Sequence, residues 1–183
     1  MRQIGMLMVV VVFALSGCGE QGASSAEKAA ASKSAAAERA AKARQEALAK
    51  KKAKQTAIYE ECRSVAVGLD DKLNNLNSRL GVGMPFAEYG KRVGDASVAY
   101  DAAVRKGKAR GGVSDSCIDR VFLPLQTALN AYTKAYNVWN DCNSDYNCDI
   151  NKGDANKKIQ GSWSKASTSL TKADDGLAAL QPA

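Results

Sequence analysis

The sequence predicts an all-α protein, an antiparallel up-down-up-down four-helix bundle that follows an Ala/Lys-rich helical spacer and is tied by two disulfides. Three observations predict this fold. Four stretches repeat apolar residues at three- and four-residue steps, the spacing of one face of a helix. No run of alternating apolar and polar residues indicates a strand. Short segments separate the four stretches, and short connections favour antiparallel neighbours in a bundle.

The chain begins with a segment typical of export. Arg2 precedes an apolar run at residues 4–15. That run is shorter than the roughly 20 residues that a membrane-spanning helix needs. A short basic start followed by such a run is typical of a secretory signal. The motif Leu-Ser-Gly-Cys at residues 15–18 follows, and it resembles the lipobox of bacterial lipoproteins.

The resemblance to lipobox lipoproteins implies that residues 1–17 are a signal peptide, cleaved between Gly17 and Cys18. It also implies a diacylglycerol thioether on Cys18, with palmitate-type chains that hold the protein to a membrane. Two or more chains anchor stably, whereas one chain binds marginally. The implied location is the cell membrane or the outer membrane, on the extracytoplasmic face. The alternative is a plain secretory signal with a cysteine near its cleavage site.

Residues 18–56 form a low-complexity segment of Ala, Lys, Arg, Glu and Ser, in which Leu48 is the only large apolar residue. A segment without an apolar stripe does not belong to a core, but Ala and long charged residues favour helix. We therefore expect a semi-rigid helical spacer next to the lipid anchor. The lysines at 50–52 are then a solvated charge run. The alternative is contact with lipid headgroups or with an anionic wall polymer.

The basic charge of the chain lies mainly in this spacer. The net charge of the chain is +7, and residues 18–56 carry nine basic and four acidic residues. Residues 57–183 carry sixteen basic and fifteen acidic residues, so the predicted bundle is nearly neutral. Proteins that bind nucleic acid usually place basic residues on the folded body beside aromatic side chains. We therefore expect no nucleic acid among the partners.

Residues 57–183 carry the four predicted bundle helices. Their apolar stripes run from 58 to 80, from 86 to 103, from 118 to 139 and from 159 to 180. Gly and Pro residues mark the ends of the first two stripes. The bundle is therefore predicted to start at residue 57.

Several residues are expected to shape these helices. Ser114 or Ser116 can cap the third helix, and Pro124 should kink that helix or mark its true start. Gly90 and Gly94 in the second helix lower helix stability and indicate close packing against a neighbour. Four aromatic residues on the last two stripes are expected to be core, the alternative being a ligand pocket between helices. These four are Tyr132, Tyr136, Trp139 and Trp163.

The bundle topology selects one pairing of the remaining cysteines. An even number in an exported protein indicates disulfides. The alternative, a zinc site, lacks both His and the usual close cysteine spacing. Cys62 and Cys117 lie near the starts of the first and third helices, which share one end of the bundle. Cys142 lies roughly 37 Å along the third helix from Cys117, and Cα atoms in a disulfide lie within about 7 Å. The predicted pairs are Cys62–Cys117 and Cys142–Cys148.

The segment between the third and fourth helices is rich in side-chain oxygens. Part of it matches the spacing of ligands in a calcium-binding EF-hand loop. The candidate ligands are Asn143, Asp145, Asn147, Asp149 and Asp154. The match is partial, because Cys148 stands at the glycine position and Asp154 replaces a bidentate glutamate. Calcium binding is one interpretation, and a polar turn is the other, because Asn and Asp tolerate turn geometry.

Catalysis has little support in the sequence. The chain has no His, which excludes nucleophiles activated in Ser-His or Cys-His pairs. Paired carboxylates occur at 60–61, 70–71 and 174–175, but neighbouring positions on a helix point in different directions. We therefore expect no enzyme activity.

Two stretches resemble segments of uncharacterised exported helical proteins of actinobacteria. The first contains Ser-Arg-Leu at 78–80, Val-Gly-Asp at 93–95 and Ala-Tyr-Asp at 99–101. The second runs over residues 128–142. The resemblance covers roughly residues 60–165 and implies no known activity, so it assigns no functional residue.

These features together predict a membrane-anchored extracytoplasmic lipoprotein whose bundle is a non-enzymatic binding or scaffolding module. The expected partners are the membrane, through the lipid on Cys18, and an envelope protein or wall polymer. No cofactor is required by this interpretation. The alternative is an envelope sensor that binds calcium or a small ligand, either in the loop at 143–154 or between helices.

Overall fold

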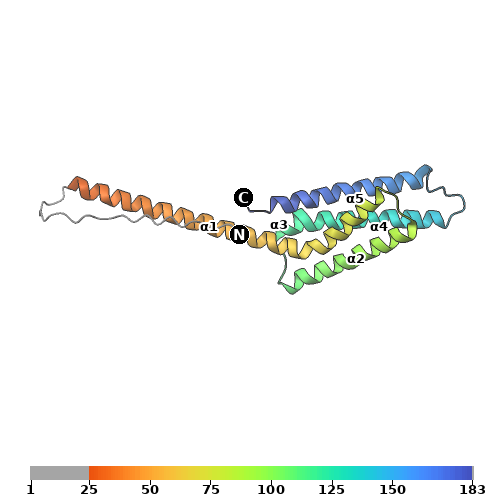
Figure 1. The fold of residues 1–183 in the computed structure, drawn as a ribbon, viewed down its shortest axis with the longest axis horizontal. Helices are drawn as coiled ribbons and strands as arrows, with labels where there is room; N and C mark the ends of the chain where they lie inside the picture. The colour runs from red at the N-terminus through yellow and green to blue at the C-terminus, as the bar shows by residue number, and fades with distance from the viewer. Residues whose placement is uncertain (1–24, 183) are drawn as a thin grey trace, which may run out of the picture. The chain divides into compact units, whose positions relative to one another are not determined.

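The computed structural model describes residues 25–182, which form helices joined by short loops (Figure 1). The chain divides into two units, residues 1–45 and 46–183. Helix α1 (Ser25–Leu80) contributes residues to both units. No strand occurs among residues 25–182, and the prediction of an all-α protein is therefore confirmed.

The second unit contains the end of α1 and all the other helices. These are α2 (Phe86–Ala109), α3 (Asp115–Cys117), the π-helix η1 (Ile118–Phe122), α4 (Leu123–Asn143) and α5 (Gly153–Ala179). Helices α3, η1 and α4 follow one another without a break, so together they form the third predicted helix. Figure 1 shows α5 alongside α4, and α2 also packs against α4.

The first unit is described only from the beginning of α1. Residues 36–45 are all exposed, as expected of a helix without an apolar stripe. The signal segment at 1–17 and Cys18 lie outside the described residues. No helix within residues 25–182 has the length and apolar character needed to cross a membrane.

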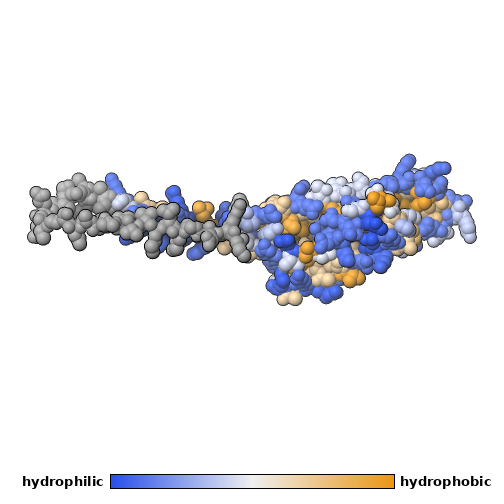
Figure 2. Space-filling model, viewed as in Figure 1, coloured by the Kyte–Doolittle hydropathy of each residue, from blue (hydrophilic) through white to orange (hydrophobic). Residues whose placement is uncertain are grey.

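The predicted apolar stripes fill the core of the second unit. From α1, the side chains of Leu69, Leu73 and Leu76 are fully buried. The core also contains Val121 of η1 and Leu125 of α4. Burial of one such side chain stabilises the fold by about 1.5–3 kcal/mol. On the face of this unit visible in Figure 2, hydrophilic residues predominate and hydrophobic residues form separate patches.

Three hydrogen bonds join the long helices through the core. The Tyr89 hydroxyl of α2 donates to the backbone carbonyl of Tyr132 in α4, at 2.8 Å. The Trp163 indole of α5 donates to the Tyr89 oxygen at 3.0 Å, and the Tyr132 hydroxyl donates to Asn77 of α1 at 2.9 Å. Burial raises the pKa of both phenols above its ordinary value. These bonds satisfy polar groups that would otherwise be costly to bury.

The aromatic side chains form one packed cluster around Tyr89. The Phe86 and Tyr136 rings stack with their centroids 5.1 Å apart. The Trp139 and Trp163 rings meet edge to face at 6.1 Å. Such pairs contribute about 0.5–1.5 kcal/mol beyond their burial. This packing agrees with the interpretation of these aromatic residues as core.

The two glycines singled out in the second predicted helix differ. A Cβ added to Gly90 would lie 2.7 Å from Cε2 of Tyr136, so Gly90 allows close packing as predicted. The prediction was wrong for Gly94, because a Cβ there would meet nothing within 4 Å. Its exposed position in α2 faces no neighbouring element closely.

Pro124 places a π turn inside the third predicted helix. Proline has no N–H, and its ring crowds the carbonyl four residues earlier, which here belongs to Arg120. The backbone N–H of Leu123 donates to the carbonyl of Ile118, five residues back, as in a π turn. Helix α5 packs closely at the same place, because a Cβ on Gly176 would lie 2.1 Å from the Arg120 oxygen. Pro124 therefore lies in the first turn of α4, and the helical chain continues back through η1 and α3.

The cysteines pair as predicted. Cys62 and Cys117 form a disulfide that joins α1 to α3, with their Cα atoms 5.5 Å apart. Cys142 and Cys148 form the second, with Cα atoms 5.2 Å apart, and it closes the loop between α4 and α5. One disulfide therefore links two helices, and the other constrains one connection.

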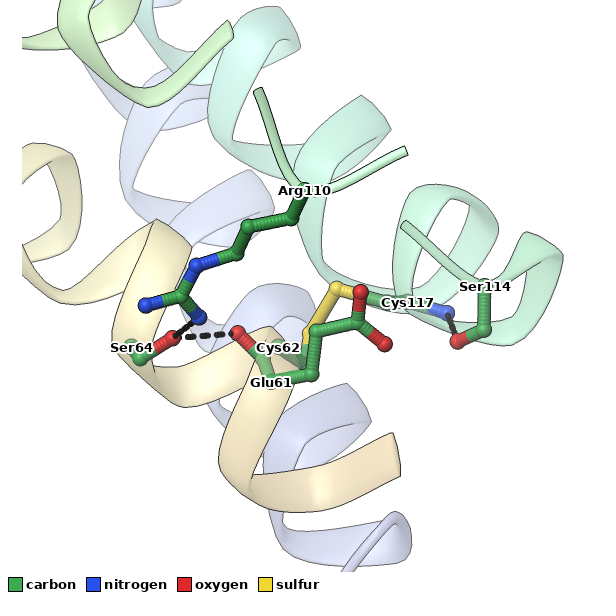
Figure 3. Close-up of a disulfide and its surroundings, with 6 residues drawn as sticks. All are labelled: Glu61, Cys62, Ser64, Arg110, Ser114 and Cys117. Atoms are coloured by element: carbon green, nitrogen blue, oxygen red, sulfur yellow. Dashed lines mark hydrogen bonds between the residues drawn. A yellow bond between two sulfur atoms is a disulfide. The ribbon is translucent and has the colours of Figure 1, made fainter. Parts of the chain in front are cut away.

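Polar contacts hold the chain around the first disulfide (Figure 3). The Ser114 hydroxyl accepts a hydrogen bond from the N–H of Cys117 at 3.3 Å, which makes Ser114 the N-cap of α3. Across the disulfide, the Arg110 guanidinium donates to the Ser64 hydroxyl at 2.5 Å, and that hydroxyl donates to the Glu61 carbonyl at 2.8 Å. The end of α2 is thereby tied to α1.

Candidate anion-binding site

A basic cleft lies between α4 and α5, and we call it the α4–α5 cleft. Its volume is about 500 Å³, which falls in the range of roughly 300–1,000 Å³ of ligand pockets. None of the described residues that line it is acidic. Its lining includes four lysines: Lys134 of α4 and Lys157, Lys158 and Lys165 of α5.

Helical spacing brings the lysines of α5 to one side of the helix. Lys157, Gly161 and Lys165 are four residues apart, and residues at that spacing lie above one another on a helix. Gly161 is exposed, and a Cβ there would meet nothing within 4 Å. Ala131 and Lys134 line the opposite wall from α4. Small side chains therefore leave space between long cationic ones.

Among the described residues, no carboxylate forms an ion pair with an ammonium group of the cleft. Within residues 25–182, the ion pairs closer than 4 Å involve Glu88 and Asp149, and neither residue lines the cleft. Lys158 also borders a neighbouring hollow with Asp141 and Asp145, but no ion pair joins them. Like charges close together repel. A bound anion would relieve that repulsion.

Ser162 adds a hydroxyl group to the wall of the cleft. Ser162 is only 7% exposed and lines the cleft. Ser97 and Thr133 elsewhere in the bundle donate to the carbonyl four residues earlier. Thr127, also in the cleft wall, donates to Leu123 at 2.8 Å. The Ser162 hydroxyl makes no such bond to any described group, which leaves it free to donate to a ligand in the cleft.

The predicted calcium ligands lie at the last residue of α4, on the loop between α4 and α5, and on the first turn of α5. All five are exposed: Asn143, Asp145, Asn147, Asp149 and Asp154. The Asp145 carboxylate accepts the N–H of Asn147 at 2.9 Å, and Asp149 accepts that of Asn151 at 2.9 Å. Across the described part of the chain, no three His, Cys, Asp or Glu residues are placed to hold a metal ion together. The geometry favours the polar turn, and calcium binding stays a prediction.

Sequence reasoning missed an acidic pair that two different helices bring together. Burial, the Asp174 carboxylate and the Asp71 carboxylate, in that order, raise the pKa of Asp70 of α1 to about 6. Burial and then the neighbouring Asp175 raise the pKa of Asp174 of α5. With Arg63, the pair borders a hollow of about 120 Å³, well under the roughly 300 Å³ of small ligand pockets. We therefore do not assign a ligand to it.

The sequence also failed to indicate the α4–α5 cleft. The net charge of residues 57–183 concealed it, because acidic residues elsewhere balance the lysines. The available signal was local, since Lys157, Lys158 and Lys165 fall within nine residues of one predicted helix. Lys134 becomes their neighbour only when α4 and α5 pack together.

The chain shows no significant match to a known protein family, a curated protein or a solved structure.

Proposed function

We propose that this chain is a lipid-anchored, non-enzymatic binding module of the cell envelope that holds an anionic polymer in the α4–α5 cleft. One observation carries the proposal: four lysines without a carboxylate partner surround a cleft that also contains the unpartnered hydroxyl of Ser162. Lysine is a mobile point charge with three donors, so it suits ligands whose phosphate or carboxylate groups vary in position.

The arrangement of charges favours a polymer over a small anion. Lys157 and Lys165 are eight residues apart, which corresponds to roughly 12 Å along the axis of α5. The lysines that line the cleft are therefore spread along α5 and are not gathered at one point. A chain with regularly repeated phosphates or carboxylates can contact several of them at once, which raises its overall affinity.

The placement of this module at a membrane is part of the proposal. Residues 1–17 act as the signal peptide, lipid on Cys18 anchors the protein, and residues 18–56 are the spacer. The extracytoplasmic face of the cell membrane or outer membrane is then its location. The helical conformation of α1 from Ser25 supports a helical spacer. The bundle is proposed to run up-down-up-down, and the Cys62–Cys117 bond supports this, because it joins the regions expected at one end.

Binding to a simple polyanion tests the function directly. The full chain, reconstituted in vesicles of neutral phosphatidylcholine, is mixed with labelled inorganic polyphosphate, and vesicle-bound label is measured after flotation. We expect saturable binding that weakens with salt, because exposed charges are screened within about 10 Å at 0.1 M ionic strength. Uncharged dextran should not bind.

A charge-matched pair of variants locates the binding. Lys157→Gln/Lys165→Gln should weaken polyphosphate binding by roughly three- to tenfold, the sum expected of two exposed charge contacts. Lys91→Gln/Lys172→Gln removes the same charge outside the cleft and should change binding little. Gly161→Glu, placed in open space, should also weaken binding. Equal losses in both double variants would show that binding follows net charge and would refute the assignment to the cleft.

A further inference from the structure

A second hollow lies on a different side of the bundle and has a different chemistry. It is bounded by the second half of α2, the loop at 110–114, η1 and the start of α4, and we call it the α2–η1 groove. Its volume is about 320 Å³, near the lower limit of roughly 300 Å³ for ligand pockets. Most of its lining side chains are apolar: Tyr100, Ala103, Val104, Val113, Ile118, Phe122 and Leu123.

Part of the apolar wall of the groove lies outside the core. In this part of the chain, Val121 and Leu125 point inward and are almost completely buried. The π turn adds a residue to the helix, and Ile118 and Leu123 remain 37% and 48% exposed. Exposed apolar side chains gathered in one hollow indicate a binding surface more strongly than scattered ones do.

The floor of the groove is opened by missing side chains. Gly107 and Gly112 both line it. Gly112 has φ +109°, a backbone conformation that residues with a side chain rarely adopt. At Gly107 an added Cβ would lie 3.2 Å from Cγ2 of Val113, so a larger residue would crowd the wall. The hollow is therefore built into the backbone of the loop and the end of α2.

The polar groups of the groove are few and all can donate a hydrogen bond. They are the hydroxyl of Tyr100, the ammonium of Lys108 and the amide of Gln126. Lys108 is the only Lys, Arg, Asp or Glu among the described residues that line the groove, and no described ion pair involves it. The charge-complementary occupant is an apolar body with a single anionic end.

We propose that the α2–η1 groove binds a long-chain carboxylate, with its acyl chain along the apolar wall and its carboxylate at Lys108. The neighbouring cations of α2 are less available, because Lys106 and Arg110 donate to Ser64 of α1. One acyl chain fits this groove better than a second copy of the protein does. Stable protein interfaces bury about 1,200–2,000 Å², far more than a hollow of this size presents.

Photo-labelling tests the groove without depending on polyanion binding. The full chain in neutral phosphatidylcholine vesicles is irradiated with dodecanoate that carries a diazirine near its chain end, and separately with the corresponding dodecanol probe. Labelled peptides are identified by mass spectrometry. We expect the carboxylate to label the segments at 100–108 and 113–123 more strongly than the alcohol does, with excess unlabelled dodecanoate suppressing the signal.

Variants separate the charge contact from the apolar wall. Lys108→Gln should lower the preference for carboxylate over alcohol by roughly two- to fivefold, the range for one exposed ion pair. Leu123→Glu should reduce carboxylate labelling further, because it places an anion in the groove. Val98→Glu is the matched control, since Val98 is exposed on α2 outside the groove.

Three outcomes would overturn the proposal. These are labelling spread evenly over the surface, a carboxylate preference that Lys108→Gln leaves unchanged, or cross-links between two copies through the groove. Lys157→Gln/Lys165→Gln should leave dodecanoate labelling unchanged. A wrong assignment of the α2–η1 groove would therefore be seen only in the photo-labelling, and a wrong proposed function would be seen only in polyphosphate binding.

Discussion

The two halves of α5 pack against the bundle in opposite ways. The first half, residues 153–165, lies next to the Cys142–Cys148 loop and lines a basic cleft with open space at Gly161. The second half, residues 166–179, contacts η1 so closely that Gly176 has no room for a side chain. One half leaves a surface for a ligand, and the other half fixes the position of the helix.

The difference shows how one helix combines binding with stability. Tight contacts beside the Cys62–Cys117 bond restrain the second half. In the first half, Ile159 and Trp163 pack into the core, while the face that carries the lysines stays open. Substitutions of those exposed lysines should accordingly affect ligand binding, and substitutions at the close contact of the second half should affect stability.

The largest expected effect is the loss of the disulfide beside the second half. The Cys62–Cys117 bond joins residues separated by 55 positions, and on the chain-entropy model this contributes about 4 kcal/mol. The Cys142–Cys148 bond spans 6 positions, and the same model gives about 2 kcal/mol. Urea unfolding of Cys62→Ala/Cys117→Ala and Cys142→Ala/Cys148→Ala should reveal this order. Equal losses would show that the two ends are restrained alike.

A pair of glycine variants compares the two halves directly. Gly176→Ala should destabilise the fold by about 1–3 kcal/mol, because a Cβ would overlap backbone that cannot easily move. Gly161→Ala should stabilise it by roughly 0.5–1 kcal/mol, because Ala favours helix and the site is open. The free energy of unfolding in urea measures both changes. A stable Gly176→Ala protein would contradict the close contact with Arg120.

The acidic pair Asp70 and Asp174 predicts a smaller, pH-dependent change in stability beside the second half of α5. The pKa of Asp70 is about 6 in the folded protein, above its ordinary value of 3.8. The folded state therefore binds this proton more tightly than the unfolded chain does, so stability increases as the pH falls from above 6 towards 4.

Asp70→Asn should remove that contribution and raise the Tm at pH 7.5 relative to the unchanged protein. The gain in Tm should shrink at pH 4.5, where Asp70 is already largely protonated. Asp101→Asn, an exposed change on α2, serves as the control. A gain that is the same at both pH values would mean that the charge of Asp70 is not the cause.

The smallest expected effect on stability is that of calcium at the loop between α4 and α5, which precedes the first half of α5. Asp145 and Asp149 already accept backbone hydrogen bonds within their own turns. Millimolar calcium should therefore leave the Tm unchanged. An increase that Asp145→Asn/Asp149→Asn abolishes would instead support the EF-hand interpretation and an envelope sensor.

The helices were predictable because apolar periodicity is a local pattern. The disulfides were predictable because four cysteines allow few pairings. Apolar residues at helical spacing placed all the long helices, and Ser114 proved to be one of the two predicted caps. The cysteine pairs followed because helix length excludes Cys117–Cys142. Apolar periodicity can be recognised within one helix at a time, so a single sequence is enough to predict the helices.

The candidate sites were harder to predict because they depend on contacts between elements. Asp70 and Asp174 are far apart in the sequence and meet only when α1 and α5 pack. The cleft requires Lys134 of α4 to face the lysines of α5. Gly94 shows the opposite error. Its sequence context matched that of Gly90, so close packing was predicted for both, but only Gly90 has a close neighbour.

The bond from Trp163 to Tyr89 gives the protein a natural optical reporter. The indole of Trp163 lies edge to face with Trp139 at 6.1 Å, and its N–H is held by the hydroxyl of Tyr89, which in turn is bonded to α4. Its emission wavelength should therefore depend on α2, α4 and α5 being assembled. A red shift in tryptophan fluorescence would report separation of the helices without any attached dye.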